Sequence, residues 1–496
     1  YISGSGSEII TFQYIVQEGD ASSDLDYLSN TALDLNGGTI NDVAGNSAEV
    51  SLAAPGAAGS LSSIKSLIID GGVPVVTMVS SQTSDGTYII GDTLNINITF
   101  NENIYVSGSP QLTLETGSSD ATSSFVSGDS STIISFRYIV ENGHNSGDLD
   151  YTSTSSLALN SGTLQDIAGN DVSLSLPIPG QSSSLSANKA LIIDGLQPTV
   201  ANVSSSLNDG LYNIGDNIPL TVTFSENVLV TGTPQLTIAT GDSNTVVDYA
   251  SGSGTNTLTF NYVVANGDYV TDLDYLGTNA LALNSGVIQD LAGNDATVTL
   301  VAAGADGSLG ANKNILVDGI IPTVSNVSAA NADGLYMIGD SIVITVTFTE
   351  AVDVTGTPQV NLSTGSANTL INYVLGSGTT TLSFDYIVES GDSVGDLGYA
   401  DTSALILNGG SIKDVAGNDA TLDFTTPGAD GSLAANKTLV IDGVLAVVNA
   451  VSSSSSDGTY KIGDTLNIAI TFNESVFTTG VPQLTLETGD ADAVVD

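Results

Sequence analysis

The chain contains no cysteine, no tryptophan and a single histidine among its 496 residues. Without cysteine it can form no disulfide bonds and perform no thiol chemistry, so stiffening has to come from packing or from bound ions. One histidine cannot supply a Ser–His–Asp set throughout so long a chain, and the lack of tryptophan argues against a sugar-stacking lectin surface and against a glycosidase. We therefore do not expect an enzyme.

Basic residues are also scarce, with 7 Lys and Arg against 54 Asp and Glu and a net charge of −47. This balance excludes nucleic acid and anionic membrane surfaces as partners, because both require clustered positive charge. No apolar run approaches the roughly 18 residues of a membrane span, so membrane insertion is not expected. Hydrophobic residues make up 41% of the chain, which is enough for packed cores and unlike a disordered acidic tail.

What the chain does have is a long internal repeat. The motif Asp-Gly-x-Tyr recurs every 124 residues, beginning at Asp85, Asp209, Asp333 and Asp457. A fixed period indicates one unit copied head to tail, and a unit of this length can form its own core. Tyr1 aligns with Tyr249, and the chain stops just before the next such tyrosine. We therefore expect a window of a longer array, with any secretion signal or anchoring domain outside it.

Each repeat carries many strand patterns and almost no helix patterns. Polar and apolar residues alternate over 95–100, and Phe136, Tyr138 and Val140 share one face of a second segment, with Arg137 between them. Turn residues such as Asn160-Ser161-Gly162 separate the segments. Seven or more short strands per repeat predict an all-β fold of tandem immunoglobulin-like antiparallel β-sandwiches, with a closed barrel as the alternative.

Asp-Gly pairs followed by proline set the expected domain boundaries. They predict complete repeats at 73–196, 197–320 and 321–444, flanked by the C-terminal part of a repeat (1–72) and the N-terminal part of another (445–496). Only two or three residues separate strands across each junction, which leaves neighbouring repeats little freedom. The expected shape is an extended rod in which the main contacts of each repeat are its neighbours in the same chain.

Six acidic positions recur at every available copy, whereas others drift, as Glu115 does to Ala239 and Ser363. In the first complete repeat the recurrent acids are Asp85, Asp92, Glu102, Asp148, Asp166 and Asp194. In a sandwich, the turns at Glu102 and 166–170 should share the N-terminal pole, and Asp85, Asp92 and Asp194 the opposite pole. Each junction would then bring the second group of one repeat against the first group of the next.

Carboxylates gathered in this way repel one another unless a cation neutralises them. Ca²⁺ accepts six to eight oxygens in flexible geometry, whereas Mg²⁺ prefers to keep its waters, so calcium is the expected ion. The expected ligands at the junctions are Asp70, Asp85, Asp92, Glu102, Asp166, Asn170, Asp194, Asp209, Asp216, Glu226, Asp290, Asn294, Asp318, Asp333, Asp340, Glu350, Asp414, Asn418 and Asp442. The alternative is that the aspartates only cap turns, although glutamate is not a turn former.

Three further features are open to two interpretations. Asp148-Leu149-Asp150 and its copies form a second candidate cation site, which loses its second acid at Gly398. Four of the seven basic residues occupy one repeat position and could form a Lys–Asn isopeptide crosslink or an ordinary ion pair; they are Lys65, Lys189, Lys313 and Lys437. His144 replaces an aspartate of the other copies, which indicates loop variation rather than catalysis.

The motif set resembles bacterial immunoglobulin-like repeats, in particular the repeat of the swimming-motility surface protein of marine cyanobacteria and related giant adhesins. The resemblance is carried over the whole chain by Asp-Gly-x-Tyr-x-x-Gly-Asp, Phe-Ser-Glu-Asn-Val, Pro-Gln-Leu, Asp-x-Ala-Gly-Asn-Asp and Lys-x-Leu-x-Ile-Asp-Gly. Ala351 and Ser475 depart from it where the second motif has Asn. It implies a secreted, cell-surface, often calcium-dependent structural segment, commonly exported by type I secretion.

Together these patterns predict a non-catalytic extender that holds a distal part of a surface adhesin away from the cell. The alternative is a self-assembling subunit of a surface filament or layer, in which other copies of the same protein are the partners. Neither interpretation identifies a distal ligand.

Overall fold

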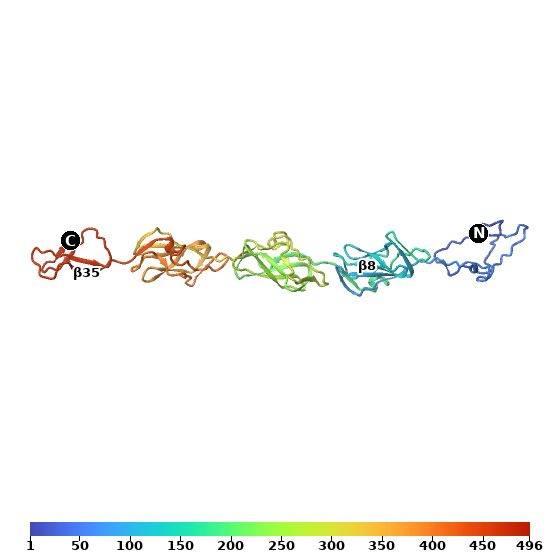
Figure 1. Cartoon of the computed structure of the whole chain (residues 1–496), viewed down its shortest axis with the longest axis horizontal. Helices are drawn as coiled ribbons and strands as arrows, with labels where there is room; N and C mark the ends of the chain where they lie inside the picture. Colours follow the sequence, from blue (N-terminus) through green and yellow to red (C-terminus); the bar gives the residue numbers. More distant parts are fainter.

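The computed structural model describes residues 1–496 and shows five bodies in a row (Figure 1). Three β-sandwiches occupy the middle, and a smaller, loop-rich piece lies at each end. The first piece contains β1 (Ala21–Ser22), α1 (Leu61–Ile64) and β2 (Ile69–Asp70). The last contains β35 (Val448–Ser453), β36 (Ile468–Phe472), β37 (Leu484–Leu486) and β38 (Ala493–Val495). The row is the extended arrangement that short linkers favour.

The three sandwiches repeat one order of elements. The first has β3 (Val76–Ser81), β4 (Gly86–Ile89), β5 (Thr93–Ser107), β6 (Gln111–Leu114), β7 (Ala121–Ser127), β8 (Ser131–Ile139), β9 (Asn145–Ser146), β10 (Leu157–Ala158), β11 (Thr163–Gln165), α2 (Leu185–Asn188) and β12 (Leu191–Asp194). The second has β13 (Val200–Ser205), β14 (Gly210–Asn213), β15 (Asn217–Thr231), β16 (Gln235–Ala239), β17 (Asn244–Ser251), β18 (Thr255–Val263), β19 (Tyr269–Val270), β20 (Asp274–Tyr275), β21 (Leu281–Ala282), β22 (Val287–Asp290), α3 (Leu309–Asn312) and β23 (Ile315–Asp318).

The third sandwich has β24 (Val324–Ala329), β25 (Gly334–Met337), β26 (Ser341–Thr355), β27 (Gln359–Ser363), β28 (Asn368–Leu375), β29 (Thr379–Ile387), β30 (Ser393–Val394), β31 (Gly398–Tyr399), β32 (Leu405–Ile406), β33 (Ser411–Lys413), α4 (Leu433–Asn436) and β34 (Leu439–Asp442). The helices are single turns of four residues, and none has the length or apolar character needed to cross a membrane. The fold is all-β, as the sequence predicts.

Each sandwich consists of one large and one small sheet. In the first, the large sheet has the order β10-β6-β7-β8-β5-β11, with β3 on β5, and the small sheet has the order β4-β12-β9. The large sheet is antiparallel, but β4 runs parallel to β12, the last strand of the repeat. Strand β4 is too short to show an alternating pattern in the sequence, and its parallel pairing decides where the neighbouring acids lie.

The predicted alternation is visible in burial. Leu94, Ile96 and Ile98 of β5 are fully buried, and Phe136 and Tyr138 of β8 are buried on either side of the exposed Arg137. Each sandwich forms a separate core of 22 or 23 buried apolar residues, and no cluster extends from one repeat into the next. Self-contained cores of this kind let each repeat fold as its own unit.

The end pieces lack strands that would cover their apolar residues. Phe12 is 56% exposed, whereas Phe136, its counterpart one repeat later, is fully buried. Phe12 is preceded by no equivalent of β3 to β5, so its face of the strand meets solvent. The complete core needs strands from the whole repeat.

Candidate metal centre at the domain junctions

The loop Asp166-Ile167-Ala168-Gly169-Asn170 presents the first candidate ligand. It closes a tight turn in which Asp166 donates its N–H to Asn170 and Gly169 adopts φ 94°, a conformation that favours glycine. One carboxylate oxygen of Asp166 accepts the Asn170 N–H at 2.9 Å, and the other accepts Asn170 Nδ2 at 2.7 Å. The loop therefore holds the Asp166 side chain in a fixed orientation.

Glu102 lies at an irregularity in the long strand β5. Pairing of β5 with β8 is regular up to Thr99 and resumes only at Ile104, after which β5 pairs with β11. Such a bulge re-aims the side chains of its residues. The same shift occurs around Glu226 and Glu350 in the later repeats.

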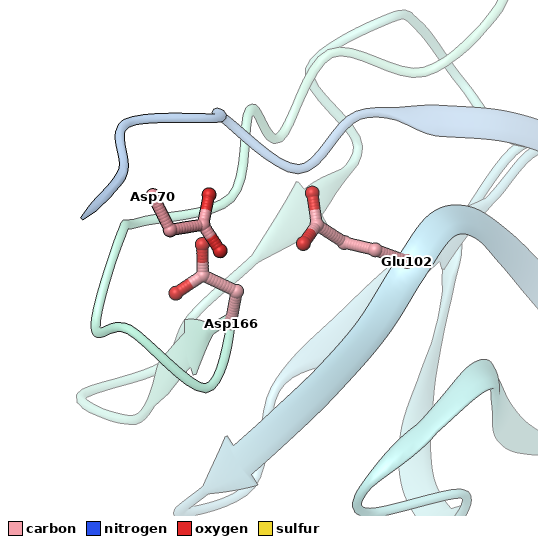
Figure 2. A group of neighbouring side chains, drawn as sticks. All are labelled: Asp70, Glu102 and Asp166. Atoms are coloured by element: carbon pink, nitrogen blue, oxygen red, sulfur yellow. The ribbon is translucent and has the colours of Figure 1, made fainter. Parts of the chain in front are cut away.

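The third candidate ligand, Asp70, belongs to the preceding repeat. It ends β2, and its Oδ1 accepts the N–H of Gly72 in the linker at 3.1 Å. Figure 2 shows the carboxylates of Asp70, Glu102 and Asp166 pointing toward one another. One oxygen from each lies within 4.8 Å of the others. Three segments from two consecutive repeats thus converge beside the linker.

The third junction repeats this arrangement with Asp318, Glu350 and Asp414, whose oxygens also come within 4.8 Å of one another. Glu350 Oε1 is buried there without a hydrogen-bond partner. Such an unpaired oxygen is costly unless a cation or a donor satisfies it. The oxygen that lacks a protein donor therefore lies within the acidic group.

At the second junction, between the first and second sandwiches, the corresponding residues are Asp194, Glu226 and Asp290. Their oxygens do not all come within 4.8 Å of one another. Burial raises the pKa of Glu226, and the charges of Asp290 and Asp194 raise it further. Burial likewise raises the pKa of Glu102, with Asp166 and Asp70 adding to the effect, and that of Glu350, with Asp318 and Asp414. At all three junctions a proton or a cation would relieve the same repulsion.

The carboxylate oxygens gathered at the junctions are suitable ligands for a hard cation. Carboxylate oxygens are the ligands that calcium prefers, and here they come from three segments. Asp70, Glu102 and Asp166 would hold the ion at the first junction, Asp194, Glu226 and Asp290 at the second, and Asp318, Glu350 and Asp414 at the third. Asp442 occupies the corresponding place at the start of the last junction, beside Glu474, whose Oε1 is also buried without a partner.

The Asp92 series serves a turn in each repeat. The Oδ2 atom of Asp92 accepts the N–H of Ile89 at 2.9 Å. Asp216 accepts from Asn213 and Asp340 from Met337 in the same way. These turns follow β4, β14 and β25 and so lie near the junction, but their aspartates are not members of the acidic groups.

The expectation that Asp85 shares a pole with Asp194 is wrong. Because β4 runs parallel to β12, Asp85 lies beside the start of β12, not beside its end. Its Oδ1 accepts the Ala190 N–H at 3.3 Å and pairs with Lys189 Nζ at 3.0 Å, which lowers the pKa of Asp85. The copies Asp209 and Asp333 accept the N–H groups of Asn314 and Thr438.

Asn170, Asn294 and Asn418 lie at the junctions, and the Nδ2 group of each donates to the preceding repeat and to an aspartate of its own loop; hydrogen bonds occupy the Oδ1 atom in Asn294 and Asn418 only. Asn294 Oδ1 accepts the N–H of Ile90 from the preceding repeat at 3.0 Å, and Asn418 Oδ1 accepts that of Ile214 at 3.0 Å. The recurrence of this asparagine is visible in the sequence, but no sequence pattern indicates that it accepts a backbone N–H from a residue 204 positions earlier.

The second candidate site is satisfied by protein donors. Asp150 accepts Ser186 Oγ at 2.6 Å and the N–H groups of Gly180 and Tyr151 at 3.0 and 2.9 Å. Burial, chiefly, raises the pKa of the neighbouring Asp148. A cation would have to displace these donors from Asp150, so the site is less suited to a metal than the junctions.

The recurrent lysines and the single histidine have structural contacts. Lys313 and Lys437 donate to the carbonyls of Leu207 and Asn331, each at 2.7 Å, and Lys189 forms the ion pair with Asp85. His144 Nδ1 accepts the Glu141 N–H at 3.1 Å, in the place of the aspartates that accept this N–H in later repeats. These contacts give neither residue type a role at the junction.

No family model matches the chain, and no curated protein matches its sequence. Among solved structures, the chain is similar to the I-band fragment I67–I69 of titin, with 9% identity and a TM-score of 0.27, over 75% of this chain and 99% of that one. It also resembles domains 4–9 of the surface layer protein SbsC, with 11% identity and a TM-score of 0.12, over 96% of this chain and 89% of that one. Both TM-scores are low, and neither likeness indicates a function.

Proposed function

We propose that the chain is a non-catalytic extender segment of a secreted bacterial cell-surface adhesin, stiffened by Ca²⁺ at the domain junctions. The observation that carries this proposal is the convergence of three carboxylates from two consecutive repeats beside the first and third linkers, with the same three residue types at the second. A cation bound there would join the end of one repeat to a strand bulge and a loop of the next. Bending the joint would then require the ion to lose ligands.

The architecture supports the extender role. Each sandwich has its own core, so the number of sandwiches in the row determines the length of the molecule. Such a row folds without a partner protein along its sides. The resemblance of the motifs to repeats of giant adhesins, including the marine cyanobacterial surface protein, supports a place outside the cell. In this interpretation the repeats carry no catalytic residues and no ligand site of their own.

One observation favours self-assembly as a second candidate. The residue after the loop aspartate is apolar in all four copies, and it is 80%, 69% and 79% exposed at Ile167, Leu291 and Val415. In an assembling subunit, another copy of the chain would cover these side chains and bury their apolar surface. Sedimentation velocity of the chain would distinguish the two, because an extender remains monomeric and an assembling subunit associates as concentration rises.

Calorimetric unfolding and solution scattering of the full chain, in calcium and in excess chelator, test the proposal. Calcium should raise the melting temperature, because an ion that binds only the folded joint stabilises it by about 2.7 kcal/mol when its concentration is 100 times its Kd. It should also lengthen the particle, because an occupied joint bends less. Glu350→Gln should reduce the calcium effect, whereas Glu389→Gln, an exposed acid of the same repeat, should not. Identical melting and scattering in both buffers would overturn the cation assignment.

A further inference from the structure

The asparagine that ends each Asp-x-Ala-Gly-Asn loop links its own repeat to the previous one. Asn294 is 3% exposed, and its Nδ2 donates to the Asp194 carbonyl at 2.9 Å and to Asp290 Oδ2 at 2.7 Å. Its Oδ1 accepts the N–H of Ile90. A single amide therefore contacts the last strand of the preceding repeat, a turn of that repeat and its own loop.

The turn that supplies the Ile90 N–H is built to present it. Asp92 donates its N–H to the Ile89 carbonyl at 3.0 Å, and Gly91 between them has φ 91°. This is the type II arrangement, in which the N–H of the second residue points away from the turn. Asp92 Oδ2 also accepts the Ile89 N–H, so the recurrent Asp92 supports the surface on which the next repeat docks.

The next junction has the same contacts. Asn418, 4% exposed, accepts the Ile214 N–H at 3.0 Å and donates to the Asp318 carbonyl at 2.8 Å and to Asp414 Oδ2 at 2.8 Å. Asn170 makes the two Nδ2 bonds to Asp70 and Asp166, but its Oδ1 has no backbone partner, since the counterpart of Ile90 would fall before residue 1. Two complete junctions thus share one set of three bonds.

We propose that Asn294 and Asn418 are inter-repeat clasps that fix the angle of each joint, and that they do so without a cation. The role requires a donor and an acceptor in one short side chain. Aspartate has no donor, and it would place a second carboxylate beside Asp290. The clasp differs from a cation ligand in its response to this substitution, because a ligand oxygen survives Asn→Asp whereas the clasp loses its donor.

The absence of cysteine allows a direct measurement of the joint. Spin labels at Val126→Cys and Ala250→Cys, exposed positions one repeat apart, report the distance between the first two sandwiches by double electron–electron resonance in the full chain. In chelator the parent chain should give a narrow distribution. Asn294→Asp should widen it about twofold, as expected when a stiff joint becomes a flexible linker. Asn170→Asp, the same change at another junction, should leave this distance unaltered.

A second variant removes the clasp from the other side. Ile90→Pro deletes the single N–H while keeping the turn, because proline is favoured at the second position of a type II turn. It should widen the distance distribution as Asn294→Asp does, and it should leave the melting temperature of the first sandwich unchanged. The double variant should give a distribution little wider than that of either single variant, because both changes remove the same contact. A narrow distribution for both variants in chelator would overturn the clasp. The proposal would also be overturned if calcium restored the narrow distance distribution in the Asn294→Asp chain, because residue 294 would then be a cation ligand.

Discussion

At the residue scale, the recurrent acids divide by the number of donors that the protein offers them. Asp150 has three donors, and Asp85 has a lysine and an N–H. Glu350 has none for its buried Oε1. Asp85 and Glu350 belong to positions that are acidic in every copy, and the position of Asp150 is acidic in all copies except the one with Gly398. Recurrence therefore identified the important acids without distinguishing structural caps from cation ligands.

The partnership between Asp150 and Ser186 predicts a stability effect. Ser186→Ala should destabilise the first sandwich by about 1.5 kcal/mol, because the buried carboxylate loses its hydroxyl donor. The third repeat has Gly398 and Ala434 at these two positions, so both partners are absent there together. Urea unfolding should show the loss in the first sandwich, and Ser155→Ala, an exposed neighbour, should show little; equal effects would contradict the prediction.

The raised pKa of Glu226 predicts a pH dependence in chelator. A folded-state pKa above the ordinary value of 4.5 means that protonation favours the folded joint below that value, and that this stability is lost as pH rises through the folded pKa. Glu226→Gln should therefore be more stable than the parent chain at pH 7 and no more stable at pH 4. Melting temperatures across this range, taken as the difference between the two chains, test the sign. A difference that is constant with pH would contradict it.

At the element scale, two short features organise the site. The bulge in β5, β15 and β26 aims the glutamate toward the linker, and the four-residue strand β4 separates Asp85 from Asp92. Neither feature was expected from periodicity, because a bulge interrupts alternation only locally and β4 is too short to show a pattern. Alternation did locate the first part of each long strand, such as 95–100 in β5 (Thr93–Ser107), but not its continuation beyond the bulge.

The single-turn helices depend on their capping serines. Ser432 is fully buried, and its Oγ accepts the N–H groups of Ala435 and Gly428 at 3.3 and 3.0 Å. Ser432→Ala should cost the third sandwich about 1–2 kcal/mol, because so short a helix has little other support. Chemical denaturation measures the loss. Ser403→Ala, on an exposed turn of the same repeat, is the control and should change stability much less.

At the scale of the whole molecule, the separate cores predict separate unfolding. Phe260→Ala should destabilise the second sandwich by about 3–5 kcal/mol and leave the first and third unchanged, because its core cluster is confined to one repeat. Phe12→Ala, at the equivalent but exposed position, should have little effect. Hydrogen exchange resolved along the chain would show the change, and a loss of protection spread over all three sandwiches would contradict it.

The sequence by itself determined the 124-residue period, the all-β class, the long strands and the set of acids that recur. These properties are local or periodic, so they can be read from spacing and alternation. Only the tertiary structure decided which acids meet. Asp70 joins Glu102 and Asp166 because a strand end, a bulge and a turn converge at the linker, whereas Asp85 is carried away by a parallel strand pairing. The contact of Asn294 with Ile90 was equally hidden, because a side chain and a backbone N–H that lie 204 residues apart leave no pattern in the sequence.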